Sequence, residues 1–452
     1  MRFNKIIPSL TLITALALAA APAAAEVSGE TAYVFNTFAF LVHGVLVMFM
    51  AAGFAMLESG LVRTKNTATI CLKNIALYSI AGIMFYLVGY NLMYVDVPEG
   101  GFMGALTLFY NPSADELALI GAADKATPEM VGKVIKGGYS VPSDWFFQMV
   151  FVATAASIVS GTVAERIKVW PFMIFVVVLS SVIYPIQASW VWGGGWLDKM
   201  GFSDFAGSTL VHSTGGWAAL TGAIILGARR GKYGPDGSVR ALPGANIPLA
   251  TLGTFILWFG WFGFNGGSQL ALGSALDATA MSIVYVNTNL AAAAGVVVAM
   301  LLAQLTYNKV DVSLALNGAI GGLVAITAGP DLQNHLIAII VGGVGGALVV
   351  IAVPLIDKMK IDDVVGAISA HLVAGIWGTL CVGIFGSGSV LTQLIGIVAI
   401  GAFVSVVSAI VWFILKATMG IRVSEEDEVL GLDKAECGME AYPEFGTGSQ
   451  TL

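Results

Sequence analysis

The sequence predicts an all-α polytopic membrane protein with eleven transmembrane helices. Of its 452 residues, 57% are hydrophobic and only 11% are charged, and the mean hydropathy is +0.85. Apolar stretches of about 20 residues recur along the chain, and each is long enough to cross a bilayer as a helix. The 55 glycines suit helices that pack closely without a hydrophobic force between them.

The first 25 residues have the pattern of a signal peptide. Arg2 and Lys5 form a short basic region, residues 6–20 are apolar, and residues 23–25 are alanines that suit a cleavage site. We expect cleavage before Glu26, and the alternative is an uncleaved first helix. The segment 1–25 is therefore assigned as a signal peptide.

The remaining chain is expected to form a membrane domain over residues 26–417 and a cytoplasmic regulatory tail over residues 418–452. The eleven spans are predicted at residues 33–58, 70–95, 145–163, 170–190, 206–228, 246–267, 278–306, 313–328, 335–356, 364–385 and 391–417. The polar, glycine-containing segment from about 96 to 143 is expected to be an external loop. The tail carries four consecutive acidic residues at 425–428, too charged for the bilayer, and we expect it to be partly helical.

The distribution of Lys and Arg predicts the orientation of the spans. With the mature N-terminus outside, the inner loops and tail hold fourteen of these residues and the outer loops hold four. Basic residues concentrate on the cytoplasmic side of membrane proteins. We therefore expect a multi-pass protein of the cell inner membrane with a cytoplasmic C-terminus.

Two histidines lie within long apolar stretches, and each follows an aspartate by eight residues. His212 follows Asp204 and His371 follows Asp363. Ionisable side chains at membrane depth are costly, so they usually face a bundle interior or an aqueous path. The matching offsets predict that spans one to five and spans six to ten are repeats, inverted because each contains an odd number of spans. Span eleven then lies outside the repeat.

Five further motifs resemble the ammonium transporter (Amt/Mep/Rh) family, and in particular its bacterial Amt type. In chain order they are Gly161 with Ala164–Arg166, Trp192–Gly195, Asp204–Gly207 continuing to His212, Gly260–Asn265, and Arg422–Glu426. The resemblance extends from about residue 30 to about residue 443. It implies ammonium transport for nitrogen uptake, by a homotrimer with a separate pore through each protomer.

The resemblance also implies roles for individual residues. An outer vestibule would recruit ammonium through aromatic faces and a hydroxyl, using Phe147, Phe151, Trp192 and Ser268. Phe151 and Phe264 would form a stacked gate below it, with Gln148 and Trp261 along the path and Asn265 in support. His212 and His371 would face one another in the lumen as neutral rings, and Asp204 would support the vestibule by accepting backbone N–H groups.

The second histidine motif departs from the commoner bacterial pattern, which has Asp five residues before the His and Gly directly after it. This chain has Gly366 and Leu372 at those positions. The departure concerns the surroundings of His371. Asp363, near the inner end of span ten, is expected to be solvated or to cap a helix.

Charge and cysteine content exclude several other classes of protein. The formal net charge of −7 argues against a nucleic-acid partner. The three cysteines, Cys71, Cys381 and Cys437, are too widely separated for a disulfide framework or a metal finger. No cofactor, bound metal or enzymatic activity is expected. The expected partners are ammonium or ammonia, the lipid bilayer, further copies of the chain and a cytoplasmic PII-type signalling protein.

Two alternatives remain open at this point. The first is an ammonium sensor or transceptor that acts through PII-type partners. The second is a membrane haem protein, because two buried histidines can ligate iron.

Overall fold

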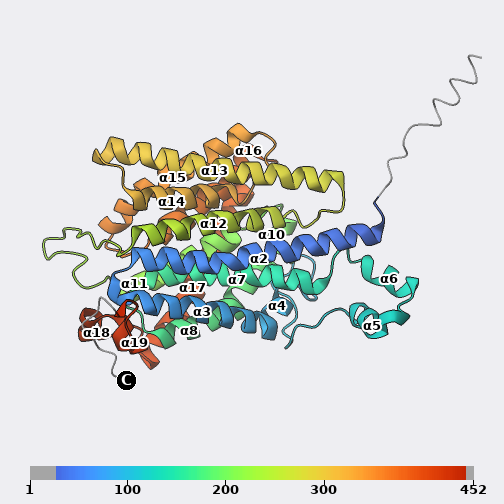
Figure 1. Ribbon diagram of the computed structural model, residues 1–452, viewed down its shortest axis with the longest axis horizontal. Helices are drawn as coiled ribbons and strands as arrows, with labels where there is room; N and C mark the ends of the chain where they lie inside the picture. The colour runs from blue at the N-terminus through green and yellow to red at the C-terminus, as the bar shows by residue number, and fades with distance from the viewer. Residues whose placement is uncertain (1–26, 444–452) are drawn as a thin grey trace, which may run out of the picture.

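A computed structural model describes residues 27–443 as a bundle of long helices (Figure 1). No strand is present within this range, where only two isolated β-bridges occur. The bundle has two ends. We call one the loop end, because it carries α5 (Ala114–Ala122) and α6 (Pro128–Ile135), and the other the tail end, because it carries α18 (Glu425–Leu430) and α19 (Leu432–Cys437). The predicted signal peptide lies outside the described residues.

Eleven apolar helical segments cross the bundle within residues 27–443, and they confirm the predicted fold class. Ten are long enough to span a bilayer and one is shorter. In chain order they are α2 (Gly29–Leu61), Thr64–Tyr94 with α3 (Thr67–Met84) and α4 (Tyr90–Tyr94), α7 (Val141–Val163), Val169–Ser189 with α8 (Val169–Val178) and α9 (Tyr184–Ser189), Ser208–Leu226 with α11 (Thr214–Leu226), α12 (Ile247–Gly267), α13 (Ala275–Tyr307), the shorter α14 (Val312–Ile326), α15 (His335–Lys358), Ile368–Phe385 with α16 (Ala374–Phe385), and α17 (Val390–Thr418).

The two halves of the bundle repeat one packing order. α2 packs against α7 as α12 packs against α14, and α3 packs against both α7 and α8 as α13 packs against both α14 and α15. Five spans in each half mean that equivalent spans run in opposite directions, as the spacing of the histidine motifs predicts. α17 lies outside this repeat and packs on α11 and α16, one helix from each half.

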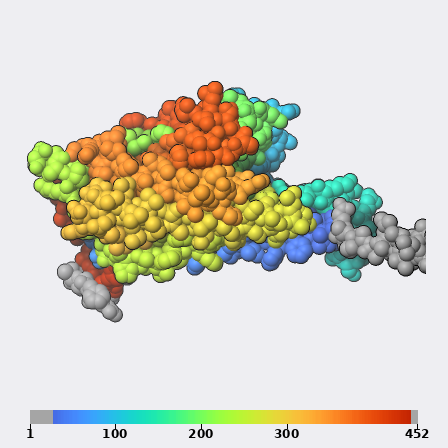
Figure 2. Space-filling view, turned by 90° about the horizontal axis from the view of Figure 1, so that it is seen from above, coloured from blue at the N-terminus to red at the C-terminus, as the bar shows by residue number. Residues whose placement is uncertain are grey.

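Close backbone contact through glycine holds α13, α14 and α15 together. A Cβ atom on Gly346 of α15 would overlap the carbonyl oxygen of Gly295 on α13. Gly318 and Gly322 of α14 meet the same region of α13. Because lipid tails are as apolar as the helices, such close approach supplies much of the attraction between spans. Figure 2 shows α13, in yellow, running along this outer face of the bundle.

The segment between the second and third spans, predicted as a loop, contains two short helices of its own. α5 begins with a capping box in which Ser113 and Glu116 satisfy each other's backbone groups. Glu116 is buried and also accepts hydrogen bonds from the Ser140 hydroxyl and the Val141 amide, where α7 begins. The segment projects beyond the bundle (Figure 2) but is tied to the start of α7.

The tail packs against the loops at the tail end. The Asp433 carboxylate accepts hydrogen bonds from the amides of Ala68 and Thr69 and from the Thr69 hydroxyl, at the start of α3. Glu428 binds the Arg422 guanidinium at 2.7 Å and accepts from the Arg230 amide at 2.6 Å. The tail therefore contacts the start of α3 and the loop that joins the two halves of the membrane domain.

A buried ion network lies beneath the tail. Arg229 contacts both Glu165, at 3.3 Å, and Asp362, at 2.8 Å, and Arg63 contacts Glu165 at 2.6 Å. Burial alone would raise the pKa of Glu165, but the guanidinium groups of Arg229 and Arg63 hold it below its ordinary value. The carboxylates therefore stay charged and brace the loops that join the spans.

The glycine contact predicts the effect of adding one methyl group. Gly346→Ala should destabilise the protein by about 1–3 kcal/mol, the usual cost of overpacking, because the new Cβ has no space beside Gly295. Thermal unfolding in detergent measures the change. The control is Gly132→Ala in α6, where a Cβ meets nothing within 4 Å. Equal unfolding temperatures for the two variants would contradict this account of the packing.

Candidate functional site

The two histidines predicted to face one another are in direct contact at the centre of the bundle. Nδ1 of His371 lies 3.2 Å from Nδ1 of His212, and the ring centroids are 5.2 Å apart. The side chains are almost completely buried, with exposures of 3% and 0%. One ring must donate and the other accept, so the pair shares one proton along this contact.

The local backbone around each histidine is the same. His212 lies in the π-helical turn η5 (Ser208–Ser213), which precedes α11, and His371 lies in the π-helical turn η6 (Ile368–Val373), which precedes α16. Single π-helical turns are rare and occur frequently at functional sites. The two turns come from opposite halves of the repeat and contact each other.

Apolar and aromatic side chains enclose the histidine pair. The Trp261 ring stacks on His212 at 4.8 Å, and Phe54 lies 6.2 Å from His371. The Trp261 indole N–H donates to Thr327, so its orientation is fixed. Nε2 of His212 is buried and has no hydrogen-bond partner within residues 27–443. Buried polar atoms usually have a partner, so this nitrogen stands out as an unused hydrogen-bonding group beside the contact between the two rings.

A pair of stacked phenylalanines lies next to the histidine pair, on its loop-end side. Phe151 and Phe264 lie face to face with ring centroids 4.0 Å apart, and Phe264 also contacts His212 at 5.1 Å. Phe147 packs on Phe151 at 4.8 Å. Asn265, predicted to be a supporting residue, donates to Thr288 and does not line the lumen cavities. The Phe151 and Phe264 rings therefore lie between His212 and the next cavity.

A cavity of about 360 Å³ lies on the loop-end side of the phenylalanine pair. Five residues predicted for the vestibule and path line it together: Phe147, Gln148, Phe151, Trp192 and Ser268. The sequence interpretation missed the six others, namely Tyr90, Tyr94, Tyr139, Asp144, Phe205 and Leu270. Asp144 could have been found from the sequence, because it lies one helical turn before the predicted Phe147 and Gln148.

Asp204 lies behind this cavity and outside its lining. Its two carboxylate oxygens accept the backbone amides of Gly207, Ser208, Thr209 and Leu210 at 2.8–3.0 Å. Its backbone oxygen accepts the Trp192 indole N–H at 3.0 Å. Asp204 thus joins the start of the His212 turn to the aromatic wall of the cavity.

The surroundings of His371 explain the two departures from the commoner bacterial pattern. Gly366 adopts a φ of +79°, and a Cβ there would crowd the Asn317 amide at 3.0 Å. Asp363 caps η6 by accepting the Ile368 amide at 2.7 Å. Leu372 packs against Gly216 of α11, where an added Cβ would overlap it. The absence of a side chain at Gly216 of α11 thus leaves space for the Leu372 side chain of η6.

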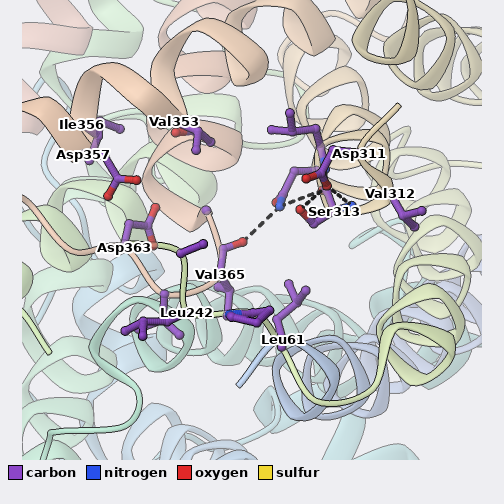
Figure 3. Close-up of a pocket in the computed structure, with 18 of the residues that line it drawn as sticks. Leu61, Leu242, Asp311, Val312, Ser313, Val353, Ile356, Asp357, Asp363 and Val365 are labelled. Atoms are coloured by element: carbon purple, nitrogen blue, oxygen red, sulfur yellow. Dashed lines mark hydrogen bonds between the residues drawn. The ribbon is translucent and has the colours of Figure 1, made fainter. Parts of the chain in front are cut away.

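A second cavity, of about 510 Å³, lies at the tail end (Figure 3). The close-up shows its acidic side chains, Asp311, Asp357 and Asp363, and the hydrogen bond from Asn317 to the Val365 oxygen. A much smaller cavity of about 10 Å³ separates it from His371 and shares Asn317 and Val365 in its lining. The histidine pair thus lies between two larger cavities at opposite ends of the bundle.

The sequence interpretation also missed two buried ionisable side chains, Glu58 and Lys73, which both contact Ser160. Glu58 lines the small cavity and accepts from the Ser160 hydroxyl at 2.8 Å, while Lys73 donates to the Ser160 backbone oxygen at 2.9 Å. Lys73 also lies 5.1 Å from the centre of the Phe172 ring. Glu58 and Lys73 are fifteen residues apart on two spans, so no local motif connects them.

Known proteins resemble this chain along most of its length. The Ammonium Transporter Family matches residues 38–442. The ammonium transporter Amt2 of Archaeoglobus fulgidus is 39% identical over 437 residues, covering 90% of this chain and 87% of that protein. The ammonium transporter of Bacillus subtilis is 34% identical over 435 residues, covering 92% and 98%.

Solved structures agree with these sequence relatives. A sensor Amt protein superimposes with a TM-score of 0.80 at 36% identity, covering 90% of this chain and 98% of that chain. Mep2 from Candida albicans superimposes with a TM-score of 0.76 at 27% identity, covering 94% of each chain.

The amide contacts of Asp204 predict a stability effect. Asp204→Asn replaces one acceptor oxygen with an NH₂ group that faces backbone donors, and a buried unsatisfied donor costs about 1–3 kcal/mol. Thermal unfolding in detergent should therefore occur at a lower temperature than in the parent protein. Asp198→Asn, an exposed site in the same loop, is the matched control. An Asp204→Asn protein that unfolds together with this control would refute the capping role.

Proposed function

The chain belongs to the ammonium transporter family, and from this premise we propose that it transports ammonium nitrogen through a pore within each protomer. Ammonium would be recruited in the aromatic cavity at the loop end and transfer its proton there to solvent water. Neutral ammonia would then pass the phenylalanine pair and the two histidines to the tail-end cavity.

The observation that carries this proposal is the contact between His212 and His371 in an otherwise apolar lumen. Ammonium has the size of potassium, so a pore that separates the two cannot rely on diameter alone. Neutral imidazoles supply a donor and an acceptor to ammonia or water. They offer no fixed negative charge that would hold a bare ion in the lumen.

The stacked rings of Phe151 and Phe264 support the same mechanism. A hydrated cation would have to give up its water to pass between them, and the rings provide no oxygen to replace it. The cost of moving an unpaired charge into an apolar interior is several kcal/mol or more. Neutral ammonia does not bear this cost, because it carries no charge.

We assign the loop end to the outside of the cell inner membrane and the tail end to the cytoplasm. The excess of Lys and Arg in the loops at the tail end supports this orientation. The homotrimer follows from the family resemblance. A pore inside each protomer is supported by the nearly complete burial of His212 and His371 by the helices of a single chain.

An ammonium sensor is the second candidate function, and the likeness to a sensor Amt protein favours it. A sensor would bind ammonium in the vestibule and signal through the tail to a PII-type partner with little net flux. A haem protein is disfavoured because the histidine rings touch each other, which leaves no room for a porphyrin between them.

The twin histidines provide the sharpest test of transport. His212→Leu and His371→Leu each remove a ring from the pair and leave its partner without its hydrogen bond. We expect ammonium flux in proteoliposomes to fall about tenfold or more, a change of about 1.4 kcal/mol in the barrier, or potassium to begin to pass. Ammonium and potassium fluxes are measured side by side.

The control for this experiment is His335→Leu, since His335 bonds to Asn287 far from the lumen. Normal ammonium flux with normal exclusion of potassium in both lumen variants would refute the pore assignment. A parent protein that binds ammonium without flux would favour the sensor.

We further propose that the tail regulates transport and forms part of the surface to which a PII-type protein binds. The contacts of Asp433 with the start of α3 support a conformational link between tail and membrane domain. Asp433→Asn weakens these contacts and should lower uptake or PII binding, whereas Asp427→Asn, at a half-buried position that accepts only from the exposed Ser424 hydroxyl within residues 27–443, should change neither. If truncation after Ile421 leaves uptake and PII binding at the parental level, the tail has no regulatory role.

A further inference from the structure

The vestibule cavity contains one carboxylate that the proposed mechanism has not used. Among the described residues that line this cavity, Asp144 alone carries a charge, and the others are aromatic, aliphatic, amide or hydroxyl side chains. Asp144 is 6% exposed. A carboxylate this deeply buried is costly to keep charged unless a cation or several donors compensate it.

The protein itself supplies only neutral donors to this carboxylate. The Tyr90 hydroxyl donates to Oδ2 at 2.8 Å and the Gln148 amide donates to Oδ1 at 3.2 Å. None of the Lys, Arg and His side chains within residues 27–443 forms an ion pair with it. Each oxygen accepts one hydrogen bond from a side chain and keeps capacity for another.

The position of Asp144 on α7 places its charge directly above the gate. Phe147 and Gln148 lie three and four residues after Asp144, and Phe151 lies four and three residues after them, so the four share one face of α7. All four line the vestibule cavity. The sequence of this face, from the loop end inwards, is therefore carboxylate, aromatic ring, amide and gate ring.

The field of the carboxylate reaches the neighbouring phenols. Burial and the charge of Asp144 together raise the pKa of Tyr139 to about 12. Tyr139 therefore keeps its proton and remains a hydrogen-bond donor at the edge of the cavity. The cavity wall combines one negative charge with tyrosine hydroxyls and with the faces of Phe147 and Trp192, a combination that suits a small cation bearing N–H donors.

We propose that Asp144 is the charged acceptor of the ammonium recruitment site, holding the cation in the vestibule through its free carboxylate capacity. The assignment rests on the proposed function. It adds a countercharge that rings and a serine hydroxyl do not provide. Because the charge lies on the loop-end side of Phe151 and Phe264, it concentrates ammonium before the gate and leaves the lumen without a fixed charge.

The test separates the charge of Asp144 from its shape. Asp144→Asn keeps the shape and removes the charge, and Asp144→Glu keeps the charge and changes the shape. We expect Asp144→Asn to raise the ammonium concentration for half-maximal flux by about tenfold, which is 1.4 kcal/mol of binding, and to change the maximal flux much less. Asp144→Glu should stay within about threefold of the parent, about 0.6 kcal/mol by the same conversion.

The control is Asp115→Asn, which removes the same charge from an exposed position on α5 and should leave half-saturation unchanged. A structural role for Asp144 predicts the reverse order, with Asp144→Glu impaired and Asp144→Asn close to the parent, and that result overturns the proposal. If Asp144→Asn fails to assemble, Asp144→Glu decides the question alone. A rise of well over threefold in its ammonium concentration for half-maximal flux also overturns the proposal.

The experiment also distinguishes this inference from the proposed function. A parent protein without ammonium flux would refute transport itself. An Asp144→Asn protein with parental half-saturation, in a preparation where His212→Leu abolishes flux, would refute only the role of Asp144.

Discussion

The cost of an unpaired charge inside a bilayer governs the design of this protein. Charges are only 11% of the chain, and the ones that structure the protein lie mainly at its two ends. Where a charge is buried within the spans, as at Glu58 and Lys73, Ser160 contacts both side chains. At the centre of the bundle, His212 and His371 share one hydrogen bond, and Nε2 of His212 has no partner among the described residues.

The same cost explains why the aspartate of each histidine motif accepts hydrogen bonds from backbone amides. Asp204 and Asp363 precede the turns η5 and η6, and the carboxylate oxygens of both accept hydrogen bonds from the amides that begin those turns. A helix start in an apolar bundle has unpaired N–H groups, and an acidic side chain satisfies them. The capped turns then hold His212 and His371 at hydrogen-bonding distance across the repeat axis.

The two ends of the bundle use charge differently. At the tail end, Arg229, Glu165 and Asp362 neutralise one another in a buried network, and the tail adds Asp433 and Glu428 to the loops around it. At the loop end, the carboxylate of Asp144 faces a cavity with only neutral donors beside it. The first arrangement stabilises connections between spans, while the second provides the charge that we propose to bind the ligand.

The sequence alone determined the number of spans, their approximate bounds and the histidine pair. Bilayer thickness sets the length of an apolar helix, so the predicted spans agree with the observed helices to within a few residues at most ends. The aromatic vestibule residues were also identifiable, because the family resemblance assigned them position by position. These features depend on local composition or on short motifs.

Only the tertiary structure decided which distant side chains meet. Asp144 accepts a hydrogen bond from Tyr90, which lies 54 residues earlier on another span, and Glu58 accepts one from Ser160 on α7. Gly366 and Leu372, unusual beside a histidine of this kind, proved compatible because Asn317 and Gly216 complement them from other helices. Hydropathy records how deep a residue lies and not which way it faces, so contacts between spans are set by packing geometry that no single segment contains.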